Sequence, residues 1–245
     1  MTQRVPFQSG RGFFVTGTDT GVGKTVAAGA IAYCLRQGGI KVGVFKPIAT
    51  GCELRREGLV SPDAEFLAHC SDTASPLEQI NPVRFRAALA PLVAAERAKT
   101  DIPWEESQLA YQNIVAQHDL VVVEGIGGVM VPIQKDYLVL DLMIDLALPV
   151  VIVARSGLGT INHTLLTLEA CRKRDLKVLG IVINQYQADR ADLAEESNPR
   201  VIAEVGKVPV ISIIPADAKT SLRSGRLGPD VITAVGLANW ADLIQ

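Results

Sequence analysis

The chain has 245 residues, 48% of them hydrophobic, and its 24 Lys and Arg against 26 Asp and Glu give a formal net charge of −2. This near balance, without any basic block, argues against a nucleic-acid-binding protein and favours small-molecule substrates. The longest apolar stretch, 139–154, is interrupted by Asp141, Asp145 and Pro149, so it falls short of the roughly 20 clean residues of a membrane span. We therefore expect no nucleic-acid partner and no membrane segment.

Six short apolar runs rich in β-branched residues follow one another along the chain, at 12–15, 41–45, 120–124, 150–154, 178–183 and 208–214. Continuous apolar runs are typical of strands covered on both faces, as in parallel sheets. Helices are predicted between them at 25–37, 104–117 and 161–174. The polar segment 187–199 is predicted to be a loop or lid before another short helix. The pattern predicts one doubly wound α/β domain over residues 1–245, with helices on both faces of a mostly parallel sheet.

The segment GTDTGVGKT, residues 17–25, joins the first predicted strand to the first predicted helix. A phosphate-binding loop needs inward backbone N–H groups, close-approaching glycines, a lysine for the β and γ oxygens and a hydroxyl for Mg²⁺. Gly21, Gly23, Lys24 and Thr25 supply these features, although the common pattern GxxxxGK[ST] has glycine where this chain has Thr18. A glycine-rich turn without a ligand is the alternative. The strand before and the helix after favour a nucleotide site and a sheet of the P-loop NTPase type.

Two carboxylates are candidates for the Mg²⁺ that accompanies a nucleotide, since this ion prefers oxygen ligands and takes few from the protein. Glu124 ends the predicted strand LVVVE, and the next residues, 126–128, could pass close to phosphate. Asp63, in SPDAEF, stands at the start of a predicted helix. The alternatives are that Glu124 caps the next turn and that Asp63 is only a helix N-cap.

Lys46 and Thr50 lie in FKPIATG, just after the second predicted strand, at the edge where ligands bind in such folds. Pro47 and Gly51 would shape a tight loop that presents both side chains toward the phosphate. A surface lysine without a partner is the alternative.

The segments GTDTGVGKT, FKPIATG, SPDAEF, VVVEGIGGVMVP, LPVVIVARSGLGTINHTLLT and GIVIN, in this order, resemble the dethiobiotin synthetase family. The resemblance runs from about residue 13 to residue 215. It implies an ATP- and Mg²⁺-dependent cyclo-ligase of biotin biosynthesis. The family's reaction converts 7,8-diaminononanoate and CO₂ to dethiobiotin through a carbamate and a carbamic–phosphoric anhydride, and releases ADP and phosphate. The resemblance also implies a homodimer with the diamine near the subunit boundary.

Site residues follow from the resemblance position by position. Lys46 and Lys24 would be catalytic, Thr50 and Thr20 would contact the diamine substrate, and Thr25, Asp63 and Glu124 would hold Mg²⁺. The residues expected to contact ATP are Gly21, Val22, Gly23, Lys24, Thr25, Val26, Asp63, Glu124, Gly125, Ile126, Gly127, Asn184, Pro215, Ala216 and Asp217, with Asn184 reading the adenine. The chain departs from the family at Ala90 and Leu92, where serine and histidine are usual.

Three rival functions share parts of these patterns. A GTPase would carry an acid shortly after the strand GIVI, but residues 184–187 are NQYQ. A ParA/MinD-like ATPase switch often carries a lysine where this chain has Asp19. A cobyrinate-type amidoligase would add a glutaminase domain, for which no length remains.

The cysteines, at 34, 52, 70 and 171, show no CxxC spacing and no metal-ligand spacing with the histidines. The N-terminal MTQRVPFQSGRG has no apolar core of the kind found in signal peptides. These features predict a protein of the reducing cytoplasm without a zinc site.

Overall fold

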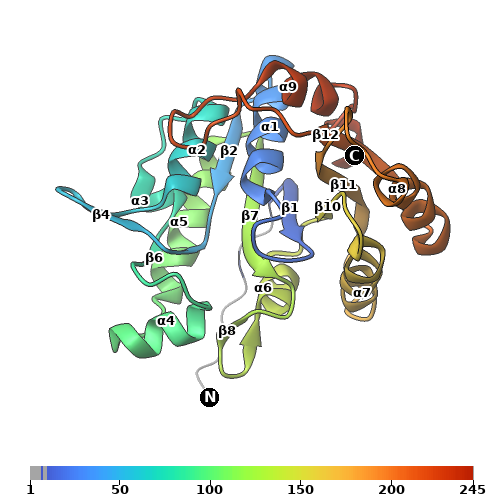
Figure 1. Cartoon of the computed structure of the whole chain (residues 1–245). Helices are drawn as coiled ribbons and strands as arrows, with labels where there is room; N and C mark the ends of the chain where they lie inside the picture. Colours follow the sequence, from blue (N-terminus) through green and yellow to red (C-terminus); the bar gives the residue numbers. More distant parts are fainter. Residues whose placement is uncertain (1–6, 8–9, 245) are drawn as a thin grey trace.

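The computed structural model describes residue 7 and residues 10–244, and it is built around one parallel sheet (Figure 1). Six strands form this sheet in the order β12-β11-β10-β1-β7-β2, and every neighbouring pair is parallel. Their bounds are β1 (Gly12–Gly17), β2 (Val42–Phe45), β7 (Leu120–Gly128), β10 (Val150–Arg155), β11 (Val178–Tyr186) and β12 (Val210–Pro215). All six predicted strands are therefore present.

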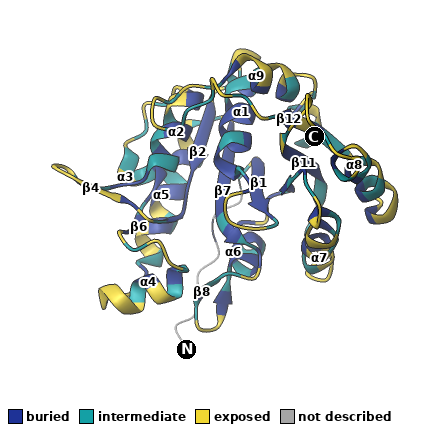
Figure 2. Ribbon diagram, viewed as in Figure 1, coloured by how far each residue is buried: buried dark blue, intermediate teal, exposed yellow. Residues whose placement is uncertain are grey.

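Helices cover both faces of the sheet because successive strand residues point to opposite sides. Phe13 and Val122 belong to one apolar core, with α1 (Lys24–Gln37), α2 (Pro62–Ser71) and α9 (Pro229–Gly236). Phe14 and Val123, one residue further along each strand, belong to the other core. That core is covered by α5 (Trp104–Gln117), α6 (Val139–Leu146), α7 (Thr160–Arg172) and α8 (Leu193–Gly206). Figure 2 shows the strands buried between these two layers.

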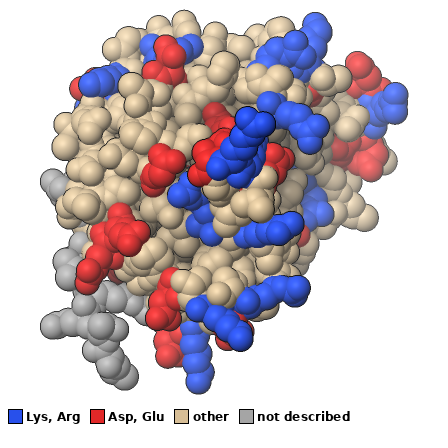
Figure 3. All heavy atoms as spheres, turned by 90° about the vertical axis from the view of Figure 1, so that its left-hand side faces the viewer, with Lys and Arg blue, Asp and Glu red and all other residues tan. Residues whose placement is uncertain are grey.

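Smaller elements lie around the carboxyl edge of β2 and β7. They are the parallel pair β3 (Ile48–Thr50) and β6 (Val83–Phe85), the hairpin of β4 (Glu53–Arg55) and β5 (Gly58–Val60), the hairpin of β8 (Pro132–Gln134) and β9 (Tyr137–Leu138), and the helices α3 (Leu77–Ile80) and α4 (Pro91–Ala98). The short helix η1 (Asp242–Ile244) follows Trp240, which packs against Phe13 at the start of β1. On the face shown in Figure 3, basic and acidic side chains are interspersed. No helix in the described part of the chain is both long and apolar enough to span a bilayer.

The predicted helices agree with the structure to within two residues, but the prediction for 187–199 was wrong in its second half. Helix α8 begins at Leu193, and Pro199 lies inside it. Asp192 starts this helix, since its carboxylate accepts a hydrogen bond from the backbone N–H of Glu195 at 2.8 Å. Pro199 lacks the N–H that would bond to the Glu195 carbonyl, and Asn198, next to it, is buried and donates hydrogen bonds to the turn after β10.

Candidate functional site

The phosphate loop lies between the end of β1 and the start of α1. Gly21 and Gly23 have left-handed φ angles of 77° and 86°, which glycine adopts without strain. At Gly23 the space is also closed, because a Cβ there would stand 1.8 Å from Nδ2 of Asn184. Within the described chain, the start of α1 has no side-chain cap and no acid in its first turn. Its free N–H groups and its dipole therefore make an anion-binding end.

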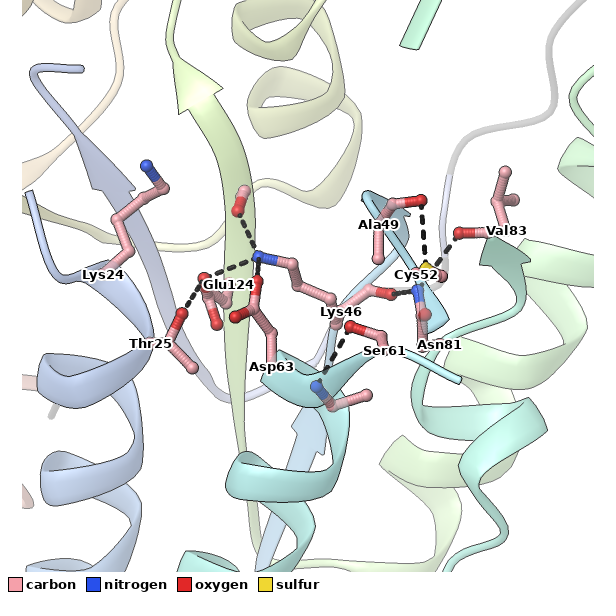
Figure 4. Close-up of polar contacts among 12 residues, drawn as sticks. Lys24, Thr25, Lys46, Ala49, Cys52, Ser61, Asp63, Asn81, Val83 and Glu124 are labelled. Carbon is pink, nitrogen blue, oxygen red and sulfur yellow. Dashed lines mark hydrogen bonds and ion pairs between the residues drawn. The ribbon is translucent and has the colours of Figure 1, made fainter. Parts of the chain in front are cut away.

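Lys46 lies between two carboxylates brought by different elements (Figure 4). Its Nζ is 2.6 Å from Oε1 of Glu124, inside β7, and 3.0 Å from Oδ2 of Asp63, in the first turn of α2. It also donates a hydrogen bond to the carbonyl of Gly125 at 3.0 Å. Thr25 Oγ1 donates to the same Glu124 oxygen at 3.0 Å. The side chains of Lys46 and Glu124 are only 3% and 1% exposed, whereas that of Asp63 is 36% exposed. The cluster is therefore an ionic network at the phosphate loop that is buried at Lys46 and Glu124 and reaches solvent at Asp63.

Local contacts explain how Asp63 and Lys46 are presented. Ser61, rather than Asp63, caps α2 by accepting a hydrogen bond from the N–H of Ala64 at 3.3 Å. The carboxylate of Asp63 is therefore available to Lys46. The backbone of Lys46 is held by Asn81, whose Nδ2 donates to the Lys46 carbonyl at 2.7 Å. Sequence reasoning assigned Asn81 no role.

The network sets the charges of the two lysines differently. Burial alone would lower the pKa of Lys46, but the carboxylates of Glu124 and Asp63 outweigh it and raise the pKa, so Lys46 stays protonated. Lys46 in turn lowers the pKa of Asp63. Burial raises the pKa of Glu124 against the effect of Lys46. Burial and then the like charge of Lys46 lower the pKa of Lys24 to about 8.

A cavity of about 640 Å³ opens beside this network. The expected site residues that line it are Thr20, Gly21, Gly23, Lys24, Thr25, Val26, Lys46, Thr50, Asp63, Glu124, Ile126 and Gly127. Residues of the lining that sequence reasoning did not assign to a site are Ala49, Ala88, Leu89, Ala90, Pro91, Val131, Gln185 and Leu222. One cavity therefore joins the phosphate loop, the ionic network and an apolar wall.

The remaining expected residues lie behind or beside the lining. The carbonyls of Val22 and Gly125 accept hydrogen bonds, from Asn184 Nδ2 at 2.9 Å and from Lys46 Nζ at 3.0 Å. Pro215 pairs with Tyr186 at the ends of β12 and β11, and the N–H of Ala216 donates to the Tyr186 carbonyl at 2.9 Å. The carboxylate of Asp217 accepts from the backbone N–H groups of Lys219 and Asp230, so it is engaged with its own loop and with the start of α9.

The unassigned lining residues differ in how they could have been found. Gln185 directly follows Asn184 at the end of a predicted strand. Because Asn184 was expected to contact ATP, its position in the sequence could have indicated that Gln185 also lies at the site. Leu222 lies where the family resemblance is weak. Of the two departures from the family, Ala90 lines this cavity, whereas Leu92 lines a separate one of about 360 Å³.

The oxygen atoms of this network fit a magnesium ion. Oε2 of Glu124 is buried and has no hydrogen-bond partner among the described residues. The Thr25 hydroxyl and the Asp63 carboxylate contact the same cluster. The described residues contain no group of three or more His, Cys, Asp or Glu able to hold a metal. Such a partial set of oxygens suits Mg²⁺, which keeps water and phosphate ligands.

Solved structures with a similar fold include two ATPase families. Septum site-determining protein MinD of Pyrococcus horikoshii, complexed with Mg-ADP, has a TM-score of 0.60 and 16% identity, covering 95% of this chain and 96% of that one. A ParA family ATPase of Chlorobium tepidum has a TM-score of 0.58 and 17% identity, covering 93% and 98%. At such identities the likeness shows the fold alone, and it confirms the predicted P-loop NTPase type of sheet.

Proteins with similar sequences identify the family of this chain more closely than the shared fold does. A family model described as an AAA domain matches residues 11–223. ATP-dependent dethiobiotin synthetase BioD of Thermodesulfovibrio yellowstonii is 39% identical, covering 90% of this chain and 94% of the relative. The proteins of the same name from Bacillus licheniformis and Bacillus subtilis are 42% and 40% identical, each over 84% of this chain and covering 86% and 87% of the relative. The chain therefore belongs to the ATP-dependent dethiobiotin synthetase family.

Proposed function

We propose that this chain catalyses the ATP- and Mg²⁺-dependent carboxylation and ring closure of 7,8-diaminononanoate with CO₂, giving dethiobiotin, ADP and phosphate. The observation that carries the proposal is the buried, protonated Lys46 beside Lys24 and Thr25 on one cavity. A binding switch of the ParA/MinD kind often carries its second lysine inside the phosphate loop, where this chain has Asp19, whereas Lys46 is a buried lysine that follows β2. The dethiobiotin synthetases to which this chain is related support the ligase function rather than that of a switch.

ATP is proposed to bind with its phosphates on the loop 21–26 and the N-terminus of α1. Because Asn184 Nδ2 donates to Val22, its Oδ1 remains an acceptor, which suits the exocyclic amine of adenine rather than the oxygen of guanine. The backbone of Pro215, Ala216 and Asp217 would pass the base. Gly125, Ile126 and Gly127 would pass the phosphates on the β7 side.

Thr25, Asp63 and Glu124 would hold Mg²⁺, which would supply positive charge to the phosphate oxygens. The chain's own residues have a second electrostatic task. The reaction brings two anions together, the carbamate and the γ-phosphate, and Lys24 and Lys46 oppose their repulsion. Lys46 is already fixed by Glu124 and Gly125, so it loses little freedom when the substrates bind.

The diamine is proposed to lie along the other wall of the cavity. Thr20 and Thr50 would offer hydroxyl groups to its polar end. The aliphatic chain would lie against Ala49, Ala88, Leu89, Ala90 and Val131, which line the cavity. Holding the carbamate and ATP in line in this way replaces separate encounters by one oriented complex.

The proposal also covers the protein as a whole. We infer that residues 1–245 act as a single domain in the cytoplasm. Its partners would be small molecules and a second copy of the chain in a homodimer, without nucleic acid or membrane.

The test is an assay of purified protein with diaminononanoate, bicarbonate, Mg²⁺ and each nucleoside triphosphate in turn, measuring dethiobiotin and released phosphate. Lys46→Gln should lower kcat about 10²- to 10³-fold, as expected for loss of a preorganised charge, while the Kd for ATP changes much less. Lys41→Gln, at an exposed lysine just before β2, serves as the matched control and should leave kcat unchanged. An equal loss in kcat and ATP affinity for Lys46→Gln would reduce Lys46 to an ATP contact. Wild-type protein that forms no dethiobiotin would refute the function.

A further inference from the structure

A buried polar cluster lies behind the nucleotide end of the cavity, where no part of the proposed reaction uses it. It consists of Ser156, directly after β10, and of Glu195 and Asn198 on α8. These residues are 5%, 9% and 2% exposed. A buried carboxylate such as that of Glu195 is costly unless its hydrogen bonds serve the structure or the site.

The contacts of this cluster connect α8 to the ends of two central strands. The Ser156 hydroxyl is hydrogen-bonded to the Glu195 carboxylate and also to the backbone carbonyl of Gln185, at 3.1 Å. Asn198 Nδ2 donates to the carbonyl of Ser156 at 2.7 Å. Glu195 therefore reaches Gln185, at the end of β11, through a single serine.

Gln185 needs such support because its backbone is unusual. Its φ angle is 63°, a left-handed conformation that a residue with a Cβ rarely adopts unless its surroundings hold it there. Gln185 lines the cavity, and its Nε2 lies 3.5 Å from the carbonyl of Gly21. Its neighbour Asn184 donates to the carbonyl of Val22 at 2.9 Å. The turn at 184–185 therefore forms the support of the phosphate loop on this side.

We propose that Glu195 is a positioning residue for nucleotide binding. Through Ser156 it holds Gln185 in the left-handed conformation, and so it fixes Asn184 and Gln185 against the phosphate loop. This inference rests on the proposed ATP site, although Glu195 itself is not among the residues that line the cavity.

The number of hydrogens refines the expectation for variants. The Ser156 hydroxyl has one hydrogen and faces two oxygen acceptors, the Gln185 carbonyl and the Glu195 carboxylate. In the wild-type protein these two acceptors share that hydrogen, whereas a glutamine at 195 would add N–H donors, so the hydroxyl could donate to Gln185 and accept from residue 195. Glu195→Gln should therefore preserve the arrangement, whereas Glu195→Ala should release it.

The experiment compares KM for ATP, kcat and Tm among variants of the full chain. Glu195→Ala should raise KM for ATP at least about fivefold with little change in kcat, the pattern of lost binding without lost chemistry. Glu195→Gln should keep the wild-type KM. The matched control is Ile202→Val, which shortens a fully buried side chain of the same helix and should lower Tm while leaving KM unchanged.

The outcomes separate a positioning role from a structural one. If Glu195→Ala lowers Tm as Ile202→Val does and KM stays at the wild-type value, the inference is wrong. If Glu195→Ala does not fold, Ser156→Ala carries the test, with the same rise in KM expected and an unchanged KM overturning the proposal. Calorimetry of wild-type protein with ATP distinguishes a failure of the proposed ATP site from a failure of the role of Glu195. If wild-type protein does not bind ATP, the ATP site itself is refuted. If it binds ATP and the KM of Glu195→Ala is unchanged, only the role of Glu195 is refuted.

Discussion

Lys24 is the group in the site whose charge should change within the working pH range. Burial and Lys46 lower its pKa from 10.5 to about 8, so free protein loses this positive charge as the pH rises through 8. We expect kcat/KM for ATP, which reports the free enzyme, to fall above about pH 8. The kcat should hold to higher pH, because bound phosphates favour protonated Lys24.

The control is Lys24→Arg, because arginine stays charged; any activity it retains should lack this alkaline limb. A wild-type kcat/KM for ATP that is flat between pH 7 and about pH 9.5 would contradict the lowered pKa of Lys24, since the Lys24 ammonium of the nucleotide-free protein should lose its proton below that upper limit. Stability follows the same shift. The unfolded chain binds more protons at Lys24 between pH 8 and 10.5, so this residue's contribution to stability rises with pH in that window. Lys46, whose pKa is raised, contributes with the opposite sign.

The sequence could predict the position of an individual site residue only where the local sequence pattern determines the local structure. Lys24 and Thr25 follow from GKT at the start of a helix, because the loop and the helix end are adjacent in the chain. The contact of Lys46 with Glu124 and Asp63 could not be predicted from spacing. It depends on β2 and β7 being neighbours in the sheet and on α2 packing beside them, which no local pattern encodes.

Helix α2 carries Asp63 into the site, so the start of this helix should matter for metal binding. Ser61 caps α2, and Ser61→Ala should cost about 1 kcal/mol of unfolding free energy. Since Asp63 lies in the first turn, we also expect a higher Mg²⁺ requirement for activity. Urea unfolding and a Mg²⁺ titration of kcat would measure both effects.

Ser61→Thr, which keeps the hydroxyl, is the control and should behave like wild type in both measurements. Lost stability in Ser61→Ala with an unchanged Mg²⁺ requirement would mean that the cap supports the fold without placing Asp63.

The six long strands were predictable because each is a continuous apolar run, buried on both faces except in the edge strand β12, where Ile213 is 39% exposed. The short strands β3 to β6, β8 and β9, two or three residues each, carry too few side chains for a periodic signal. Helix α8 was missed at 193–199 because its start is polar and contains Pro199. Its position depends on the buried contacts of Glu195 and Asn198 with Ser156, which are tertiary.

For the assembled protein we expect a homodimer. Light scattering should give twice the chain mass of 26.2 kDa. Leu158, 87% exposed in the turn after β10, is proposed to lie in the interface because this turn stands at the same edge of the sheet as the site. Leu158→Asp should then give monomers with reduced activity.

Leu237, 85% exposed after α9, offers a control of equal exposure, and Leu237→Asp should remain dimeric. A wild-type mass of one chain, or a dimer that survives Leu158→Asp, would contradict the interface.

The amide of Asn184 fills the space that a side chain at position 23 would need. The phosphate loop and the end of β11, which are far apart in the sequence, are therefore in direct contact before any ligand binds. The distance between the expected positions of the adenine base and of the terminal phosphate is therefore fixed before the nucleotide binds. Little entropy is then lost in ordering the pocket on binding. Evolution could enlarge residue 23 only by altering residue 184 as well.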